Sequence, residues 1–152
     1  MTAKEYLMSL SEMKEELRME KEMRQEYLDM AASTSIRMDE VRVQCSRSDN
    51  GRVERYGTLA ADLSRKIEQV EFEYYEHQYT IIQQIRELRE ILYIQLLYKV
   101  YVQFKSIRRA AKEMGMAYNY IIKKHGDALE KFNLLHRNAI ADWEKGKVNH
   151  GA

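Results

Sequence analysis

Seven residues between Lys105 and Lys123 combine basic charge with groups that can contact the edges of base pairs. They are Lys105, Arg108, Arg109, Tyr118, Asn119, Ile122 and Lys123. An Asn side chain offers a donor and an acceptor side by side, which suits adenine, whereas Lys reaches guanine or phosphate and Tyr bonds phosphate or stacks. Residue types at this spacing predict contact with double-stranded DNA.

These side chains need two helices to hold them, and the stretch 106–132 predicts both. Ser106 suits the N-cap of a short helix that runs through Met114. Gly115 can take the left-handed conformation that ends this helix, and a second helix follows from about Ala117. We therefore expect a helix-turn-helix whose second helix carries the site. The alternative is an ordinary helical hairpin, because Ala and Gly are common at such spacings.

Apolar residues and charge both fit this interpretation. The expected core of the motif is Ile107, Ala110, Ala111, Met114, Met116, Ile121, Ala128, Leu129 and Phe132. The chain carries a net charge of only +1, yet the stretch from Lys105 to Lys131 is basic and residues 1–30 are acidic. A basic patch within a helix-turn-helix pattern is typical of nucleic-acid binding, although charges this mixed also suit any solvated face.

The composition favours long helices and an all-α fold. The chain of 152 residues contains no Pro and six Gly, so little in it interrupts a helix. The single Cys45 cannot form an intramolecular disulfide, and with no signal peptide we expect a cytoplasmic protein. No run of about 18 apolar residues is present, so we expect a soluble chain without a membrane partner.

Two long helices are expected to form an N-terminal arm. Thr2 and Glu5 have the spacing of a capping box for a helix over 2–31, and a loop should follow at about 32–52. Beyond it, apolar residues recur in steps of three and four, which predicts a coiled-coil seam. The seam consists of Val53, Tyr56, Ala60, Leu63, Ile67, Val70, Tyr74, His77, Ile81, Gln84, Leu88 and Ile91.

The expected helix lengths call for a partner. At about 1.5 Å per residue, a helix over 2–31 is about 45 Å long, whereas one from 53 to about 98 is near 70 Å. We therefore expect the longer helix to break near Tyr79, and the regular seam from Val53 to Tyr74 to support a homodimer. The expected domains are the arm over 1–78, the helix-turn-helix domain over 79–135 with a short link at 99–105, and a helix end over 136–152 with a disordered tail from Glu144.

No pattern in the chain predicts an enzyme, a cofactor or a metal site. The histidines at 77, 125, 136 and 150 are too far apart and lack carboxylate or thiol neighbours at ligand spacing. No nucleophile and base are paired at a recognisable spacing, and no glycine loop could bind phosphate.

Three segments together resemble a family of small helical proteins of Gram-positive phages and integrated elements, similar to the late-gene and autolysin transcription regulators. The segments are MTAKEYLMSL, VQCSRSDNGRVERYGTLAADLSRKIE and RRAAKEMGMAYNYIIKKHGDALEKF, and the resemblance covers about residues 1–132. In that family the C-terminal part is similar to region 4 of bacterial sigma factors. Matching positions are Lys99 to Val102 at a helix end, Ala110 and Ala111 at an Ile-Ala pair, Tyr120 and Ile121 in the recognition-helix core, and His125, Ala128 and Leu129 at its ending. Ala110 and Lys124 depart from the branched residue and the Leu that the family has there.

The resemblance implies a sequence-specific DNA-binding regulator of phage or mobile-element genes that could recruit RNA polymerase. The alternative is a non-enzymatic coiled-coil adaptor in which a degenerate helix-turn-helix only packs. Salt-dependent affinity for DNA distinguishes the two.

Overall fold

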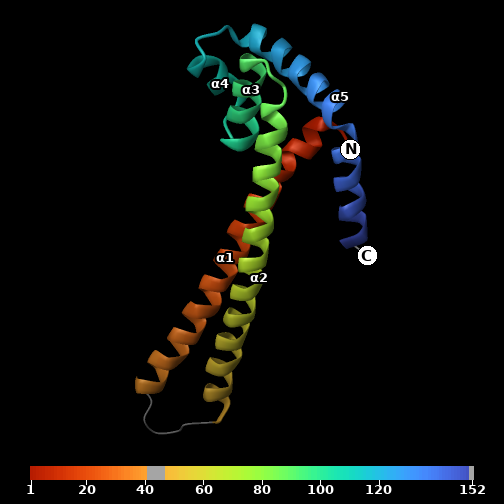
Figure 1. The fold of residues 1–152 in the computed structure, drawn as a ribbon. Coiled ribbons are helices and arrows are strands. Elements are labelled where there is room, and N and C mark those ends of the chain that lie inside the picture. Colours follow the sequence, from red (N-terminus) through yellow and green to blue (C-terminus); the bar gives the residue numbers. More distant parts are fainter. Residues whose placement is uncertain (41–46, 151–152) are drawn as a thin grey trace. The chain divides into compact units, whose positions relative to one another are not determined.

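The computed structural model describes residues 1–40 and 47–150, and within these ranges the chain is all-α, as expected. The elements are α1 (Ala3–Glu40), α2 (Arg47–Arg86), α3 (Ile91–Leu97), the π-helix η1 (Tyr98–Val102), α4 (Ile107–Glu113) and α5 (Tyr118–His150) (Figure 1). Among these described helices, none has both the length and the apolar character that crossing a bilayer requires.

The chain divides into two compact units. One, which we call the arm, comprises residues 13–74, and the other, the head, comprises residues 1–12 together with 75–152. The expected boundary at residue 78 lies close to this division. The expected arm, however, began at residue 1, whereas the first turns of α1 belong to the head.

In the arm, α1 and α2 run side by side in opposite directions (Figure 1). The seam residues Ala60, Ile67 and Tyr74 are buried, and Leu17 of α1 is buried with them. Across the pair, the rings of Tyr27 and Tyr56 stack with centroids 6.3 Å apart. The seam of the arm is thus partly covered by α1, and its members Val53, Tyr56, Leu63 and Val70 stay half-buried.

Ion pairs at the edges of the arm also join α1 to α2. Lys66 Nζ lies 2.6 Å from Glu20 Oε1, and Lys21 Nζ lies 3.8 Å from Glu71 Oε1. The side chains of Lys66, Lys21 and Glu71 are at least 37% exposed, whereas that of Glu20 is 13% exposed. Pairs with an exposed partner contribute about 1 kcal/mol or less each. They fix the alignment of the two helices more than they stabilise them.

The predicted loop at 32–52 is wrong over most of its length, because α1 continues to Glu40 and α2 already begins at Arg47. Ser and Thr cost a helix only tenths of a kcal/mol each, so the cluster at 33–35 does not end it. Cys45, expected in this loop, lies outside the described residues.

The predicted break near Tyr79 is also wrong, since α2 continues to Arg86. The turn that follows depends on Arg89, a non-glycine residue at φ 65°, and on Leu88, which is fully buried. After this turn the seam ends, and Ile91, predicted as its last member, is 71% exposed.

The head has an enclosed core to which α1, α2, α3 and α5 all contribute. Its fully buried side chains include Leu7, Leu10, Ile81, Ile85, Leu88, Leu96, Leu97 and Phe132. The two polar members of the seam, His77 and Gln84, have hydrogen-bond partners inside this core. His77 Nε2 lies 2.7 Å from Ser9 Oγ, and the Tyr6 hydroxyl donates to Gln84 Oε1 at 2.9 Å.

His77 is further enclosed by Trp143, whose ring stacks on it with centroids 3.8 Å apart. Burial, with a smaller contribution from the charge of Lys147, lowers the pKa of His77 from 6.5 to about 4. This histidine is therefore a neutral core residue at neutral pH.

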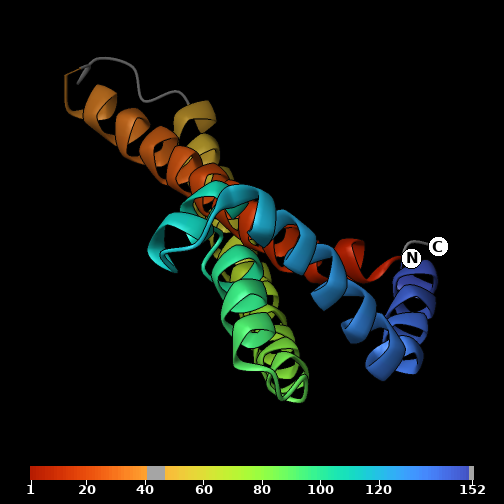
Figure 2. The same ribbon diagram turned by 90° about the horizontal axis from the view of Figure 1, so that it is seen from above.

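Both ends of the described chain are held in the head. Thr2 and Glu5 form the expected capping box, with Thr2 N–H donating to Glu5 Oε2 at 2.8 Å and Glu5 N–H donating to Thr2 Oγ1 at 3.2 Å. The Met1 amino group lies 3.2 Å from Glu144 Oε2, and Figure 2 shows the start of α1 beside the segment of α5 that follows the kink.

The predicted disordered tail from Glu144 is wrong for residues 144–150, which continue α5 to His150. Residues 151–152 lie outside the described ranges. The helix kinks at His136 (φ −120°, ψ 22°), whose Nε2 lies 3.0 Å from the Gln84 carbonyl oxygen. The ion pair of Lys147 with Glu12 at 3.6 Å then holds the segment beyond the kink against α1.

Candidate nucleic-acid interface

Two helices joined by a short turn, α4 and the start of α5, occupy the stretch where the sequence predicts a helix-turn-helix. Ser106 is the N-cap of α4, and its Oγ accepts a hydrogen bond from the Arg109 N–H at 3.1 Å. Gly115 adopts φ 67°. Its N–H donates to the Lys112 carbonyl at 3.2 Å, and the Met116 N–H donates to the Ala111 carbonyl at 3.0 Å. These two bonds are a Schellman motif, which ends α4 and turns the chain into α5.

A small apolar core fixes α4 against α5 and α3. Ala110, Ala111, Ile121 and Leu96 are buried together, with Ile107 and Met114 packed against them. Ala110, Ala111 and Ile121 are thus buried, as the sequence predicts. Two expected core residues are wrong: Met116 is 39% exposed in the turn, and Tyr120 is 47% exposed on α5.

The first six residues of α5 turn almost entirely outward. Ile121 is fully buried, whereas Tyr118, Asn119, Tyr120, Ile122 and Lys123 are all exposed. Farther along, His125, Ala128 and Phe132 continue the buried face in steps of three and four. Anchored from behind in this way, the start of α5 presents Asn119 and Lys123 one turn apart on the same face.

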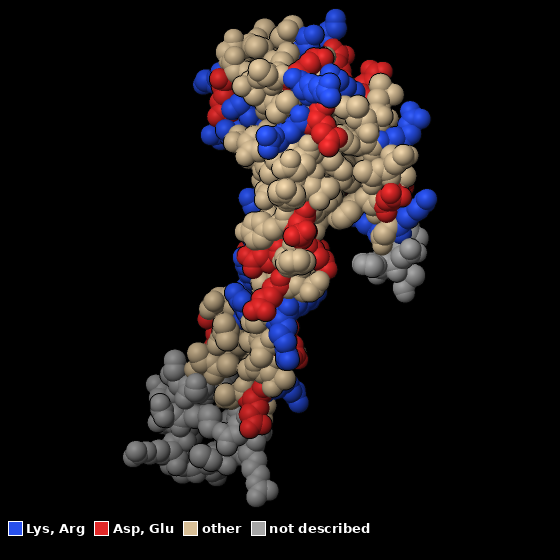
Figure 3. All heavy atoms as spheres, viewed as in Figure 1, with Lys and Arg blue, Asp and Glu red and all other residues tan. Residues whose placement is uncertain are grey.

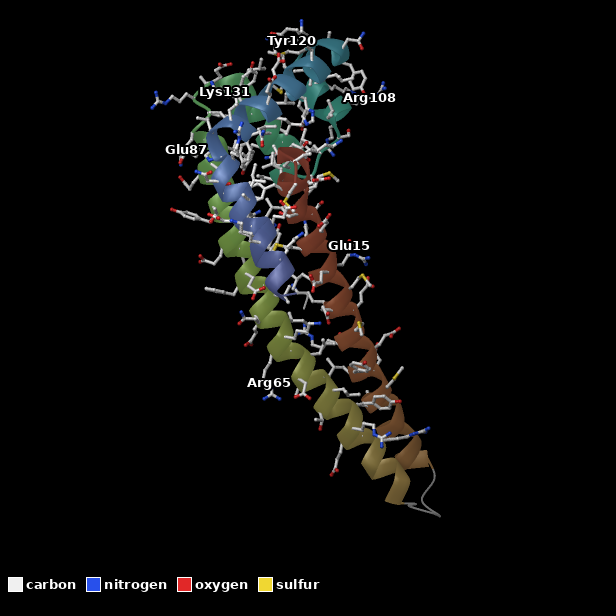
Figure 4. All side chains as sticks on the ribbon, turned by 90° about the vertical axis from the view of Figure 1, so that its right-hand side faces the viewer. Glu15, Arg65, Glu87, Arg108, Tyr120 and Lys131 are labelled. Carbon is white, nitrogen blue, oxygen red and sulfur yellow. The ribbon has the colours of Figure 1, made fainter. Side chains whose placement is uncertain are left out.

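Arg108 of α4 lies beside this outward face, with its guanidinium carbon 4.6 Å from the centroid of the Tyr118 ring. Such a cation–π contact orients the guanidinium without removing its charge. Lys124 Nζ lies in a similar way 5.5 Å from the Tyr120 ring. Figure 4 shows Arg108 and Tyr120 at the end of the head where α4 meets α5.

Glu113, the last residue of α4, pairs with several of the nearby cations. Its carboxylate lies 2.9 Å from Lys105 Nζ, 3.5 Å from Lys99 Nζ and 3.9 Å from Arg109 Nε. The hydrogen bond from Lys105, reinforced by the charges of Lys105 and Lys99, lowers the pKa of Glu113, which is thus ionised at neutral pH. Figure 3 shows Lys and Arg interspersed with Asp and Glu on the visible face of the head.

This arrangement divides the seven predicted site residues into two groups. Arg108, Tyr118, Asn119, Ile122 and Lys123 are exposed around the start of α5. Lys105 and Arg109 share Glu113, and the Lys105 side chain is only 21% exposed. Sequence reasoning missed the role of Glu113, although its position four residues after Arg109 was the available signal.

Tyr120 and Lys112 are exposed beside the site but were not among its predicted residues. The resemblance assigned Tyr120 to the core, and only the packing of Ile121 next to it shows that Tyr120 must point outward. Lys112 lies on α4 within the stretch predicted to be basic, and it is exposed.

Beneath the second turn of α5, His125 is buried and its Nε2 lies 2.8 Å from the Tyr101 hydroxyl. Burial raises the pKa of Tyr101 to about 12. Burial also lowers the pKa of His125, to which the charge of Lys4 contributes. The pair is therefore neutral at pH 7 and joins η1 to α5 under the outward face.

Over residues 1–40 and 47–150, no three His, Cys, Asp or Glu side chains come together in a way that could hold a metal ion. Comparisons with known proteins found no matching family model, no similar curated protein and no similar solved structure. Any assignment of function therefore depends on the chain's own geometry and on the resemblance of its motifs.

Proposed function

We propose that the protein binds double-stranded DNA in a sequence-specific way, with the start of α5 in the major groove. The observation that carries the proposal is the outward face of Tyr118, Asn119, Ile122 and Lys123, held by the buried Ile121 and by the Schellman turn at Gly115. A recognition helix needs this combination, because its N-terminal residues contact base edges while its opposite face is fixed by packing.

Each exposed side chain has a role that suits its chemistry. Asn119 can donate to and accept from adenine, and Ile122 can contact a thymine methyl group. Lys123 and Arg108 can neutralise phosphates on either side. The positive end of the α5 dipole also favours phosphate near Tyr118.

The resemblance of the sequence extends this proposal to the regulation of phage or mobile-element genes, with RNA polymerase as an expected partner. A homodimer would bind two half-sites about one helical turn apart. The α1–α2 seam offers such a dimer only half-buried side chains, among them Val53, Leu63 and Val70.

The adaptor alternative is supported by exposed aromatic side chains on α2. Phe72 is 64% exposed and Tyr79 is 66% exposed, and exposed aromatic residues are enriched at protein interfaces. An adaptor would use such residues without contacting DNA. The two functions differ in whether the affinity for DNA exists and depends on salt.

The test is selection of binding sites from random duplexes, followed by titration of the selected duplex with variants. Asn119→Ala should cost about 1 to 3 kcal/mol at the selected site and relax discrimination at one base pair, because a bidentate contact is lost. Asn138→Ala, an exposed Asn farther along α5, is the matched control and should bind as the wild type does.

Lys123→Ala should weaken binding to the selected duplex and to random duplexes equally. It should also reduce the slope of log affinity against log salt by about 0.9, because one fewer counterion is released on binding. Arg108→Ala should behave like Lys123→Ala, and Lys145→Ala, on the exposed surface beyond the kink, should leave the slope unchanged. If the wild type shows no salt-dependent binding, the helix-turn-helix only packs and the adaptor function is favoured.

A further inference from the structure

A cavity of about 470 Å³ lies in the head between the first turns of α1 and the segment that enters α4. Leu7 and Met8 of α1 form one wall, and Val100, Phe104 and Ile107 form the other. Its volume falls in the range of about 300 to 1,000 Å³ that small-molecule sites occupy. The walls therefore offer an apolar space large enough for a small ligand.

The charges around this cavity are of one sign. Lys4 and Lys105 line it, and no Asp or Glu is among the residues that do. Lys4 is exposed on the first turn of α1, whereas Lys105 is partly neutralised by Glu113 at 2.9 Å. Lys4 thus provides the stronger attraction for an anion.

Uncharged polar groups complete the lining. Tyr101 and His125 line the cavity, are buried, and share their 2.8 Å hydrogen bond, so neither offers a charge to a ligand. A charged group of the ligand should consequently lie at Lys4, and its apolar part should lie against Leu7, Val100 and Phe104.

The wall of the cavity beside α4 includes a residue with an unusual backbone conformation. Phe104 adopts φ 57°, which costs a non-glycine residue of the order of 1 to 3 kcal/mol. It follows the π-helix η1, and its conformation is held by the Lys105 N–H, which donates to the Lys99 carbonyl at 3.0 Å. Single-turn π-helices and left-handed non-glycine residues both occur preferentially at functional sites.

We propose that this cavity binds a small amphipathic carboxylate, with the apolar chain between α1 and η1 and the carboxylate on Lys4. Ser106 and Ile107 also line the cavity, so an occupant touches the N-cap and first residue of α4. Of the seven residues predicted to contact DNA, Lys105 lines the cavity and the other six do not. Binding of the carboxylate on Lys4 therefore does not depend on the proposed DNA binding.

The test is calorimetric titration of the full chain with decanoate, with decanol and decyltrimethylammonium as matched probes of the same chain length. Decanoate should bind with a dissociation constant below about 1 mM, and the alcohol and the cation at least tenfold more weakly. Amide chemical shifts should change for residues 4–11 and 100–107.

Two variants identify the site. Lys4→Glu should weaken the binding of decanoate at least tenfold, because it places a negative charge beside the carboxylate of the ligand. The substitution should not disturb the fold, since position 4 is exposed on the first turn of α1, where an acidic side chain suits the helix dipole. Lys145→Glu makes the same charge change outside the cavity and should have no effect. Met8→Trp, which adds bulk at the wall, should abolish binding.

Three results would overturn the proposal. They are the absence of decanoate binding up to about 1 mM, equal binding of decanol and decanoate, and equal loss of binding in Lys4→Glu and Lys145→Glu. Circular dichroism of each variant distinguishes loss of the site from loss of the fold.

Discussion

The arm and the head enclose their apolar residues to different degrees. In the arm, the seam residues Ala60, Ile67 and Tyr74 are buried, whereas others such as Val53 and Leu63 are only half-buried, because two helices cover a seam from two sides only. In the head, four helices converge, and side chains such as Leu10, Ile85 and Phe132 are completely enclosed. Since burial is the main favourable term in folding, the head should hold most of the stability per residue.

The largest expected effect compares the same substitution in the two units. Phe132→Ala removes a fully buried ring from the head and should lower the free energy of unfolding by about 3 to 5 kcal/mol. Phe72→Ala removes a ring from the arm that is 64% exposed and should change it by less than about 0.5 kcal/mol. Chemical denaturation followed by circular dichroism measures both, and equal losses would show that the arm is enclosed by something else.

As the pH falls, the head should lose stability before the arm does. His77 titrates near 6.5 when unfolded but only at about 4 in the head, so between these values the unfolded chain binds more protons. Stability is therefore full above pH 6.5 and falls as the pH decreases towards 4. From pH 7 to 5 the loss should be about 1 to 2 kcal/mol, with the lowered pKa of His125 acting in the same direction.

Amide hydrogen exchange at pH 7 and 5, corrected for intrinsic rates, locates this loss. Protection should fall in the head and hold in the arm, because no histidine occurs in residues 13–74. In His77→Gln, whose amide can still hydrogen-bond to Ser9, the pH dependence should be smaller. An unchanged dependence in that variant would exclude His77 as its source.

Glycine substitutions should have opposite signs in the two units. Gly115 lies at φ 67°, so Gly115→Ala places a Cβ in a left-handed residue and should destabilise the head by about 1 to 2 kcal/mol. Gly57 lies within α2, where an added Cβ meets nothing within 4 Å, and Gly57→Ala should stabilise the arm by about 0.5 to 1 kcal/mol. Thermal and chemical denaturation measure whether each substitution stabilises or destabilises the protein. If both substitutions destabilise it, the assignment of Gly57 to a helix is contradicted.

The same contrast explains which features could be predicted from the sequence. The capping box of Thr2 with Glu5, the Ser106 cap and the Gly115 turn each depend on local residue chemistry, and all three are confirmed. Of the seam predicted from Val53 to Ile91, the buried members are Ala60, Ile67, Tyr74, His77, Ile81, Gln84 and Leu88. The turns at Arg89 and Phe104 could not be predicted, because these residues take a left-handed conformation that neither favours locally.

For the candidate interface, residue types and helical spacing were enough to find Asn119 and Lys123, but not to decide which neighbouring charges are free. That depends on where the side chain of Glu113 lies. Lys99 and Lys105 reach it from outside α4 at 3.5 and 2.9 Å, so their pairing follows from the tertiary fold.

The smallest expected effect concerns these paired cations, and it depends on the proposed DNA binding. Glu113→Gln removes a negative charge beside the candidate interface and releases Lys105 to reach a phosphate. Affinity for random duplex DNA should rise severalfold at low salt, and the slope of log affinity against log salt should steepen by about 0.9 for each cation released.

Glu20→Gln in the arm is the control, because it frees Lys66 in the same way from an ion pair of 2.6 Å. Because Lys66 lies on α2, outside α4 and α5, this control should leave both quantities unchanged. If the two variants raise the affinity for DNA equally, net charge alone explains the binding, and α4 and α5 have no special role in it. If only Glu113→Gln raises the affinity, the phosphates lie next to the end of α4.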